Sequence, residues 1–188
     1  MARIKEFDRD ATLQRAIEVF SQHGYEGTST QMLLDAMGVS RQSLYDTYGD
    51  KWRLYLECLQ RYVSDSVGGY LLALESGSGV AAIEAFLTRA VDQARAAAEP
   101  ACLGVGAICE FGRGSAEVLA LTETSTRLLT AALARRLSEV LPAPIAREVE
   151  EGADFLMAAV TGIKVAARAG MSRDKLLGIA RRALRAVH

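Results

Sequence analysis

The stretch GVSRQSLYDTY, residues 38–48, joins a glycine turn to a short helix whose polar groups are gathered at its beginning. Gly38 can adopt the left-handed backbone conformation that a tight turn between two helices requires. Ser40 is a favourable N-cap residue, and the next three positions carry an arginine, a glutamine and a serine. A helix that enters the major groove of DNA with its N-terminal end needs its hydrogen-bonding groups there. The stretch therefore predicts the second half of a helix-turn-helix motif.

Two further helices are expected ahead of this stretch. Apolar residues at helical spacing form one stripe after residue 8, at Leu13, Ala16, Ile17 and Phe20. Asp8 is a plausible N-cap for that helix, and Gly24 is a plausible stop. Thr28, followed three residues later by Gln31, predicts a capping box at the start of a second, short helix. Three helices within about 50 residues, the last two joined by a tight turn, have the layout of a helix-turn-helix domain.

The remainder of the chain is also expected to be helical. Asp50 predicts the N-cap of a long fourth helix, and further helices are expected at about 79–98, 101–111, 115–141, 145–169 and 172–187. No strand-like alternation of β-branched residues persists anywhere. The expectation is an all-α fold with a helix-turn-helix domain at residues 1–49 and a larger helical domain at residues 50–188.

The polar residues of the motif predict a DNA-binding surface. Arg41 suits guanine, Gln42 suits adenine and Ser43 suits either, so these three are the predicted base readers, next to the N-cap Ser40. Donors to backbone phosphates are predicted at the start of the second helix, further along the third and at the start of the fourth: Thr30, Gln31, Tyr45, Tyr48 and Lys51.

The stretch GYEGTSTQMLLDAMGVSRQSLYDTYGDKWRLY, residues 24–55, resembles the DNA-binding segment of the TetR family of bacterial transcriptional repressors. Two positions depart from the family pattern: Leu34 stands where a small alanine is usual, and Tyr48 replaces the common phenylalanine. The resemblance implies a homodimer in which each chain has an N-terminal DNA-binding domain and a C-terminal domain for effector binding and dimerisation. The family's C-terminal domains diverge, so the resemblance names no effector.

Effector and dimer contacts are expected in the second domain. Cavity residues are proposed among aromatics on its helices, together with one cysteine: Tyr62, Phe86, Cys102, Phe111 and Phe155. The helix at 145–169 is apolar on most sides and carries a strip of small residues, which favours close approach of another helix. The resemblance favours a dimer through the last two helices, at Ala158, Gly162, Ala166, Leu177 and Leu184. For each of these residues, a place in the core of its own chain is the alternative.

Composition excludes several classes of protein. The chain has 22 basic and 23 acidic residues among 188, so no bulk positive charge signals a nucleic-acid partner. Three cysteines and two histidines lack metal-ligand spacing, and no cofactor or catalytic motif is present, so we expect neither a metal, a cofactor nor an enzyme. No secretory leader and no membrane-spanning segment are expected, which favours the cytoplasm.

The sequence thus predicts a transcriptional regulator, most simply a repressor released from a pseudo-palindromic operator by a small effector. A second hypothesis is switching by covalent modification of Cys102, because cysteines followed by leucine occur at this place in family members that respond to electrophiles. A third is a helical scaffold that uses the hairpin for protein contacts; an absence of sequence-selective DNA binding would favour it.

Overall fold

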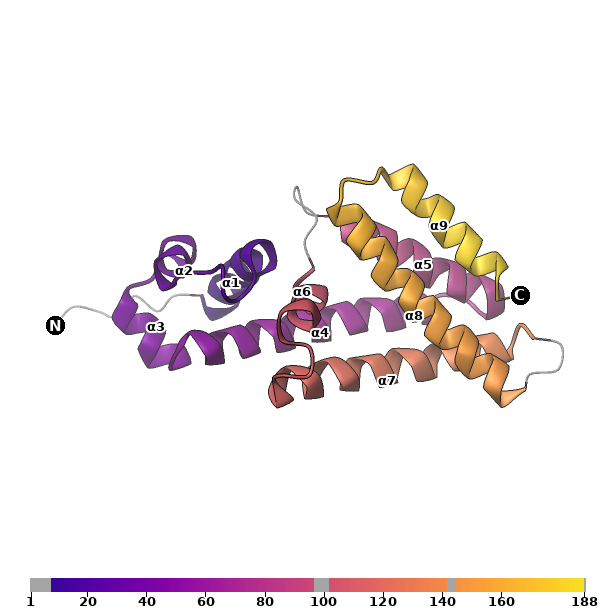
Figure 1. Ribbon diagram of the computed structural model, residues 1–188, viewed down its shortest axis with the longest axis horizontal. Coiled ribbons are helices and arrows are strands. Elements are labelled where there is room, and N and C mark those ends of the chain that lie inside the picture. The colour runs from indigo at the N-terminus through magenta and orange to yellow at the C-terminus, as the bar shows by residue number, and fades with distance from the viewer. Residues whose placement is uncertain (1–7, 97–101, 142–144, 188) are drawn as a thin grey trace.

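The computed structural model describes residues 8–96, 102–141 and 145–187, and within them every regular element is an α-helix (Figure 1). In chain order the helices are α1 Arg9–His23, α2 Thr30–Met37, α3 Arg41–Tyr48, α4 Lys51–Glu75, α5 Gly79–Arg95, α6 Leu103–Phe111, α7 Ala116–Ser138, α8 Ala146–Arg168 and α9 Arg173–Arg185. The expected all-α architecture is confirmed, with helix ends within a few residues of the expected ones. No described helix is long and apolar enough to cross a membrane.

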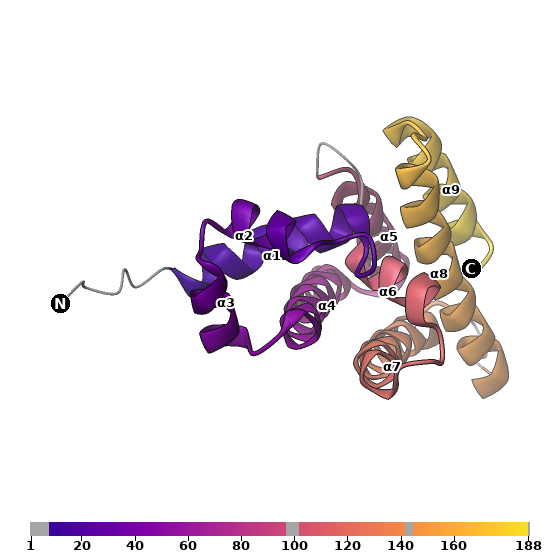
Figure 2. The same ribbon diagram turned by 60° about the vertical axis from the view of Figure 1, so that its left-hand side comes forward.

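Helices α1 to α3 form a small head that projects from one end of the molecule (Figures 1 and 2). The predicted stripe on α1 is buried, with Phe20 1% and Ala16 0% exposed. Leu33 of α2 and Leu44 of α3 close the same core, each at most 1% exposed. Leu34 is also buried, so the larger side chain at this departure from the family pattern is accommodated within the head.

Short polar side chains fix where the helices of the head begin. Asp8 accepts hydrogen bonds from the backbone amides of the first turn of α1, as expected. Ser40 Oγ accepts from the Ser43 amide at 3.1 Å, and Asp50 accepts from the Arg53 amide at 2.8 Å, which confirms both predicted caps.

One predicted cap is wrong. Ser29, and not Thr28, caps α2: its Oγ accepts from the Met32 amide at 3.2 Å. Thr28 is buried and its hydroxyl donates to the Gly24 carbonyl. Gln31 donates to Asp35 one turn later, so no capping box forms.

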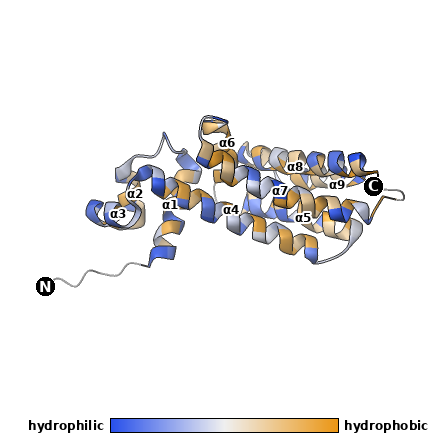
Figure 3. Cartoon of the chain, turned by 90° about the horizontal axis from the view of Figure 1, so that it is seen from below, coloured by the Kyte–Doolittle hydropathy of each residue, from blue (hydrophilic) through white to orange (hydrophobic). Residues whose placement is uncertain are grey.

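The body consists of α4 to α9. Helix α4 runs from the head along the body, with α7 beside it, while α5, α8 and α9 pack on one another (Figure 1). The core of the body gathers side chains from these five helices; among them Ile83, Phe86 and Leu156 are completely buried. Apolar residues follow the packed sides of α4, α6 and α7 in the hydropathy view (Figure 3).

Hydrophobic packing does not stop where the head ends. The head core continues through Leu54 and Leu59 of α4 to Leu103 and Ala107 of α6 and Val118 of α7. A cluster of aromatic rings joins the parts here: Phe20 of α1 lies edge-on to Tyr55 of α4 at 5.1 Å between ring centroids, and Phe111 of α6 lies 5.2 Å from Trp52. The division at residues 49 and 50 therefore stays a prediction about chain organisation, since the cores do not separate there.

Candidate nucleic-acid interface and effector cavities

The tight turn between α2 and α3 presents the beginning of α3 at the outer end of the head. Gly38 has φ +69° and ψ +33°, the left-handed conformation expected from the sequence. Arg41 and Gln42 are exposed in the first turn of α3, whereas Leu44 points into the core. The helix thus holds its polar residues toward solvent with an apolar anchor beneath them. This is the arrangement that a major-groove reader requires.

Two predicted DNA contacts are paired with acids in the free protein. Gln42 Nε2 donates to Asp46 Oδ1 at 2.8 Å, and Gln31 Nε2 donates to Asp35 Oδ1 at 2.8 Å. Each pair lies four residues apart on one helix face, a spacing that stabilises helices modestly. Binding of Gln42 to a base would therefore replace an existing hydrogen bond and bring Asp46 close to the DNA.

The serine and threonine residues of the motif are arranged around the helix starts. Thr30 is half-buried in the first turn of α2. Ser40 is exposed, and its Oγ lies 2.9 Å from Ser43 Oγ, so the two hydroxyls share a hydrogen bond. Ser43 is half-buried as a result. These hydroxyls lie near exposed helix N-termini, where backbone amides favour anions such as phosphate.

The two tyrosines of α3 differ sharply. Tyr45 is 41% exposed, so its phenol is available to a phosphate. Tyr48 is only 5% exposed, its hydroxyl is buried, and the Arg9 guanidinium lies 5.6 Å from its ring centroid. The structure therefore contradicts the prediction that Tyr48 contacts DNA. It is a core residue of the head, as the family's usual phenylalanine would be, because its ring seals α3 against α4.

Lys51, the remaining predicted phosphate contact, lies at the start of α4. Its Nζ is 4.1 Å from the centroid of the Tyr25 ring, a cation–π contact, and the side chain is half-buried. The ammonium group is therefore held by the head itself as well as being near its surface.

A small cavity of about 120 Å³ lies in the body among α4 to α8, and we call it the core cavity. Three of the five proposed effector residues line it: Tyr62, Phe86 and Cys102. Tyr62 Oη donates a hydrogen bond to Cys102 Sγ at 3.2 Å. Burial, and then the neighbouring Cys102, raises the pKa of the Tyr62 phenol, so the phenol stays protonated and remains a donor.

The other two proposed effector residues do not reach this cavity. Phe111 lies in the aromatic cluster between head and body, where Tyr25, Trp52 and Tyr55 surround its ring. Phe155 is 46% exposed and lines neither described cavity. The structure gives neither residue a place in this cavity: the Phe111 ring packs where head and body meet, and Phe155 lies at the surface.

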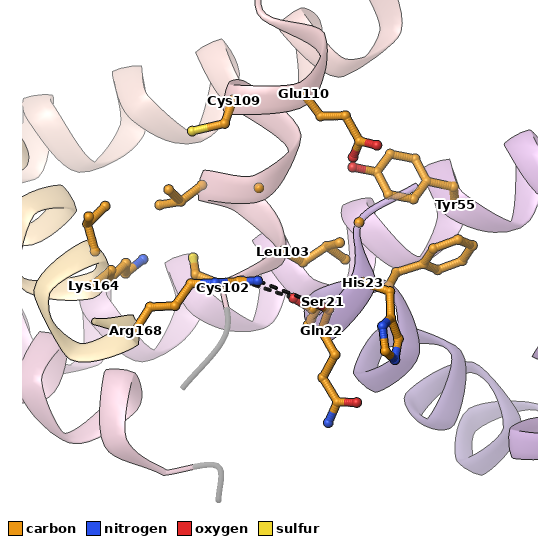
Figure 4. A pocket seen from close by; sticks show the side chains of 15 residues that line it. Ser21, Gln22, His23, Tyr55, Cys102, Leu103, Cys109, Glu110, Lys164 and Arg168 are labelled. Carbon is orange, nitrogen blue, oxygen red and sulfur yellow. Dashed lines mark hydrogen bonds between the residues drawn. The ribbon is translucent and has the colours of Figure 1, made fainter. Parts of the chain in front are cut away.

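A larger cavity of about 450 Å³ lies where the head meets the body (Figure 4), and we call it the joint cavity. The end of α1 forms one wall, α6 forms another, and Lys164 and Arg168 of α8 complete it. It shares Cys102, Val105 and Lys164 with the core cavity, so these residues stand between the two.

Two side chains of the body hold the head across this joint. Glu110 of α6 accepts hydrogen bonds from the backbone amides of Tyr25 at 2.9 Å and Glu26 at 2.7 Å. Arg168 of α8 donates to the carbonyls of Ser21 and Gln22, both at 3.2 Å. The Arg168 bonds satisfy carbonyls in the last turn of α1, where the helix dipole also favours a cation.

The site residues predicted from the sequence include none of Glu110, Lys164 and Arg168. Lys164 could have been singled out from the sequence, because it interrupts the most apolar stretch of the chain. A charge that is buried there is costly unless another group stabilises it. Arg168 could not, because an arginine in the last turn of a helix is ordinary. Arg168 donates to backbone carbonyls that lie nearly 150 positions earlier in the chain, and no local sequence pattern reveals a contact over that separation.

The residues predicted for dimerisation fall into two groups. Ala158 and Gly162 are exposed on α8, and Gly162 has open space around it. Leu184 is buried in the body's own core, and Ala166 and Leu177 are partly buried against that core. These last three are explained by packing within the chain, which was the alternative left open for them.

Comparison with known proteins identifies the head. Residues 13–58 match the model of the family described as bacterial regulatory proteins, tetR family. The uncharacterized HTH-type transcriptional regulator YezE of Bacillus subtilis (strain 168) is 49% identical over 80 residues, covering 43% of this chain and 41% of YezE. The similarity to YezE thus involves less than half of either protein.

Other relatives extend over the body. The HTH-type transcriptional repressor ComR of Escherichia coli (strain K12) is 29% identical across 97% of this chain and 90% of its own. A cysteine mutant of the TetR family transcriptional regulator CifR, solved with a 26 bp double-strand operator DNA, is 31% identical. It covers 98% of this chain and 99% of its own, with a TM-score of 0.80. The chain therefore belongs to the TetR family and is a helix-turn-helix transcriptional regulator.

Proposed function

We propose that this protein is a homodimeric repressor that binds a pseudo-palindromic operator in double-stranded DNA and is released by a small effector. The observation that carries the proposal is the exposed first turn of α3, with Arg41 and Gln42 held on a buried apolar anchor at the end of the head remote from both cavities. Operator DNA in the CifR complex and the name of ComR as a repressor support it. Such a regulator acts where the chromosome is, in the cytoplasm.

Selection of bound duplexes from a random DNA pool tests this proposal. We expect enrichment of one motif with two inverted half-sites whose centres are one helical turn, or a multiple of it, apart. Enrichment of a single half-site would contradict the dimeric part of the proposal. Enrichment of no motif would contradict the reading of base sequence by α3 and favour a helical scaffold.

The homodimer is proposed through α8, with α9 beside it. Large and small apolar residues are exposed along one side of α8, at Phe155, Ala158, Gly162 and Val165; Phe155 is 46% and Val165 is 51% exposed. Their spacing of three and four residues places them on one helix face. Ile179 of α9, 37% exposed, is a further apolar side chain left at the surface of this helix pair. A second copy of the same chain would bury this face by two-fold symmetry.

Replacing Gly162 with leucine is expected to weaken the dimer by about 1–3 kcal/mol, because the larger side chain overpacks a close helix contact. A Cβ added at Gly162 would have open space around it, and Gly162 is exposed on α8, so the fold of the protomer should be unchanged. Sedimentation velocity over a concentration series measures the effect, and Gly68→Leu on α4 offers a control, because Gly68 is exposed, helical and also has open space around it. Normal dimerisation of Gly162→Leu would remove Gly162 from the interface.

The effector is proposed to be a small organic molecule. The core cavity, at about 120 Å³, has room for little more than one aromatic ring, and the joint cavity adds about 450 Å³ beside it. Release of DNA requires that the effector bind one arrangement of the heads better than another. The hydrogen bonds from Glu110 and Arg168 to the head lie at the joint cavity, and such a preference can reach α1 through them.

A second candidate function is covalent sensing through Cys102. The specific observation in its favour is the hydrogen bond from the Tyr62 hydroxyl to the sulfur, together with the position of Cys102 at the N-cap of α6. The side chain is half-buried and lines both cavities, so a small electrophile that enters either of them can reach the sulfur. When the cysteine adds to an electron-poor alkene, the sulfur forms a bond to one alkene carbon and gives up its proton to water. The other alkene carbon takes a proton from water.

The cysteine hypothesis predicts a selective loss of response. Cys102→Ser should retain operator binding but resist release by N-ethylmaleimide, whereas Cys58→Ser and Cys109→Ser should respond like the unchanged protein. Cys58 is buried, and burial raises the pKa of its thiol, while Cys109 is exposed and serves as the accessible control. Electrophoretic mobility shift before and after treatment measures the release. Equal responses of all three variants would return Cys102 to a packing role.

A further inference from the structure

The charges around the joint cavity are not balanced by ion pairs. Lys164 and Arg168 bring two positive charges to its wall from α8, and Glu110 brings a carboxylate from α6. Both oxygens of Glu110 accept hydrogen bonds from head amides, and none of the ion pairs among the described residues includes Lys164 or Arg168. The cavity therefore presents two cations that lack a carboxylate partner.

The two cations are placed so that one ligand can reach both. Lys164 and Arg168 are four residues apart, so they lie on the same face of α8. Figure 4 shows both side chains extending from α8 toward the cavity, with Arg168 crossing it to reach Ser21. The Lys164 ammonium lies 5.2 Å from the Tyr70 ring centroid, a contact that stabilises its charge without neutralising it.

The remainder of the lining suits an apolar body rather than a bare ion. Phe20 and Tyr55 contribute aromatic rings, while Leu103 and Val105 contribute aliphatic surface. A volume of about 450 Å³ falls within the range of small-molecule sites, which are apolar with a few polar groups that fix orientation.

We propose that the joint cavity is the binding site of a small organic anion whose negative group is held between Lys164 and Arg168. The inference deepens the proposed function, because it gives the effector a chemical class and a place. The anion competes with the Ser21 and Gln22 carbonyls for the Arg168 guanidinium. The guanidinium can hold an anion through two parallel hydrogen bonds between opposite charges, whereas the two carbonyls are neutral acceptors, so the anion loosens α1 from α8.

A pair of dyes that differ by one charged group tests the site without DNA. The anionic probe is 8-anilinonaphthalene-1-sulfonate, and its uncharged counterpart is N-phenyl-1-naphthylamine, which lacks the sulfonate. Fluorescence titration of the full chain should show that Arg168→Gln and Lys164→Gln each weaken binding of the sulfonate about tenfold or more. Binding of the uncharged dye should change by less than about threefold, since its contacts are apolar.

Two further variants separate charge from other effects. Arg168→Lys keeps a cation at the wall and should retain most of the affinity for the sulfonate. Arg147→Gln removes an exposed arginine at the far end of α8, where it pairs with Glu151, and should leave both dyes unaffected. Thermal unfolding followed by circular dichroism checks that each variant is folded.

Each outcome decides the matter. Loss of sulfonate binding in both glutamine variants, with the uncharged dye unaffected, supports the proposal. Loss with Lys164→Gln alone would place the anion in the core cavity, which Arg168 does not line, and would overturn it. Unchanged sulfonate binding, or equal losses for both dyes, would also overturn it. None of these results depends on operator binding, so failure here leaves the proposed repressor function standing.

Discussion

Truncation of Phe20 to alanine is expected to lower the free energy of unfolding by about 3–5 kcal/mol, the usual cost of removing a buried aromatic side chain. Phe20 is 1% exposed, and its ring lies 5.1 Å from Tyr55 and 6.4 Å from Tyr25 between centroids. Removing it leaves a cavity in the cluster that joins α1 to α4. Urea denaturation followed by circular dichroism measures the loss.

Leu72→Ala is the matched control for that experiment. Leu72 lies on α4 but is 68% exposed, so its truncation should change the stability by no more than about 0.5 kcal/mol. A loss below about 1 kcal/mol for Phe20→Ala would show that the head contributes little to the cooperative unfolding unit.

Replacing Arg41 with alanine should weaken binding to the selected operator by about 1–3 kcal/mol, or about 5- to 150-fold, and relax the preference at one base pair in each half-site. The expected loss is large because this protein gains little non-specific affinity for DNA from its charge. Residues 1–61 carry 8 basic and 9 acidic residues, so few charges attract the phosphate backbone and individual donors weigh heavily. Fluorescence anisotropy with operator and scrambled duplexes at several salt concentrations measures both effects.

Arg147→Ala supplies the comparison, because that arginine is exposed on α8, far from the head. Its operator affinity should match that of the unchanged protein. If Arg41→Ala lowers affinity equally for operator and scrambled duplexes, Arg41 contacts phosphate and the assignment of the reading residues is wrong.

The helices of the head and the turn between α2 and α3 were predictable because they depend on local signals. Gly38, Ser40 and the apolar stripe of α1 encode their conformations within one or two turns of helix, and the structure has them as expected. Tyr48 was misplaced because a tyrosine at the end of a helix suits a phosphate contact and a buried ring equally well. Only the packing of α3 against α4 decides between them.

The cavities were less accessible to prediction, because they form between helices that are distant in the sequence. Tyr62, Phe86 and Cys102 come together from α4, α5 and the start of α6. Phe155 has the same apolar character and ends on the surface. Helical periodicity shows which face of a helix is apolar, but it does not show whether that face meets a core, a cavity or another molecule.

The hydrogen bonds from Glu110 and Arg168 end on main-chain atoms of the head, so these bonds do not depend on which side chains the head carries there. Substitution of Ser21, Gln22 or Glu26 alters no group that either side chain grips. The requirement on the head is a shape: Gly24, with φ +72°, lies so close to Glu110 that an added Cβ would stand 3.0 Å from its carboxylate. A head taken from another regulator, with a different operator but the same glycine turn after its first helix, would keep these hydrogen bonds, and it would also need aromatic rings at the positions of Phe20 and Tyr25 to pack against α4 and α6. Exchange of the head between two regulators that share these features would combine the DNA specificity of one with the effector response of the other.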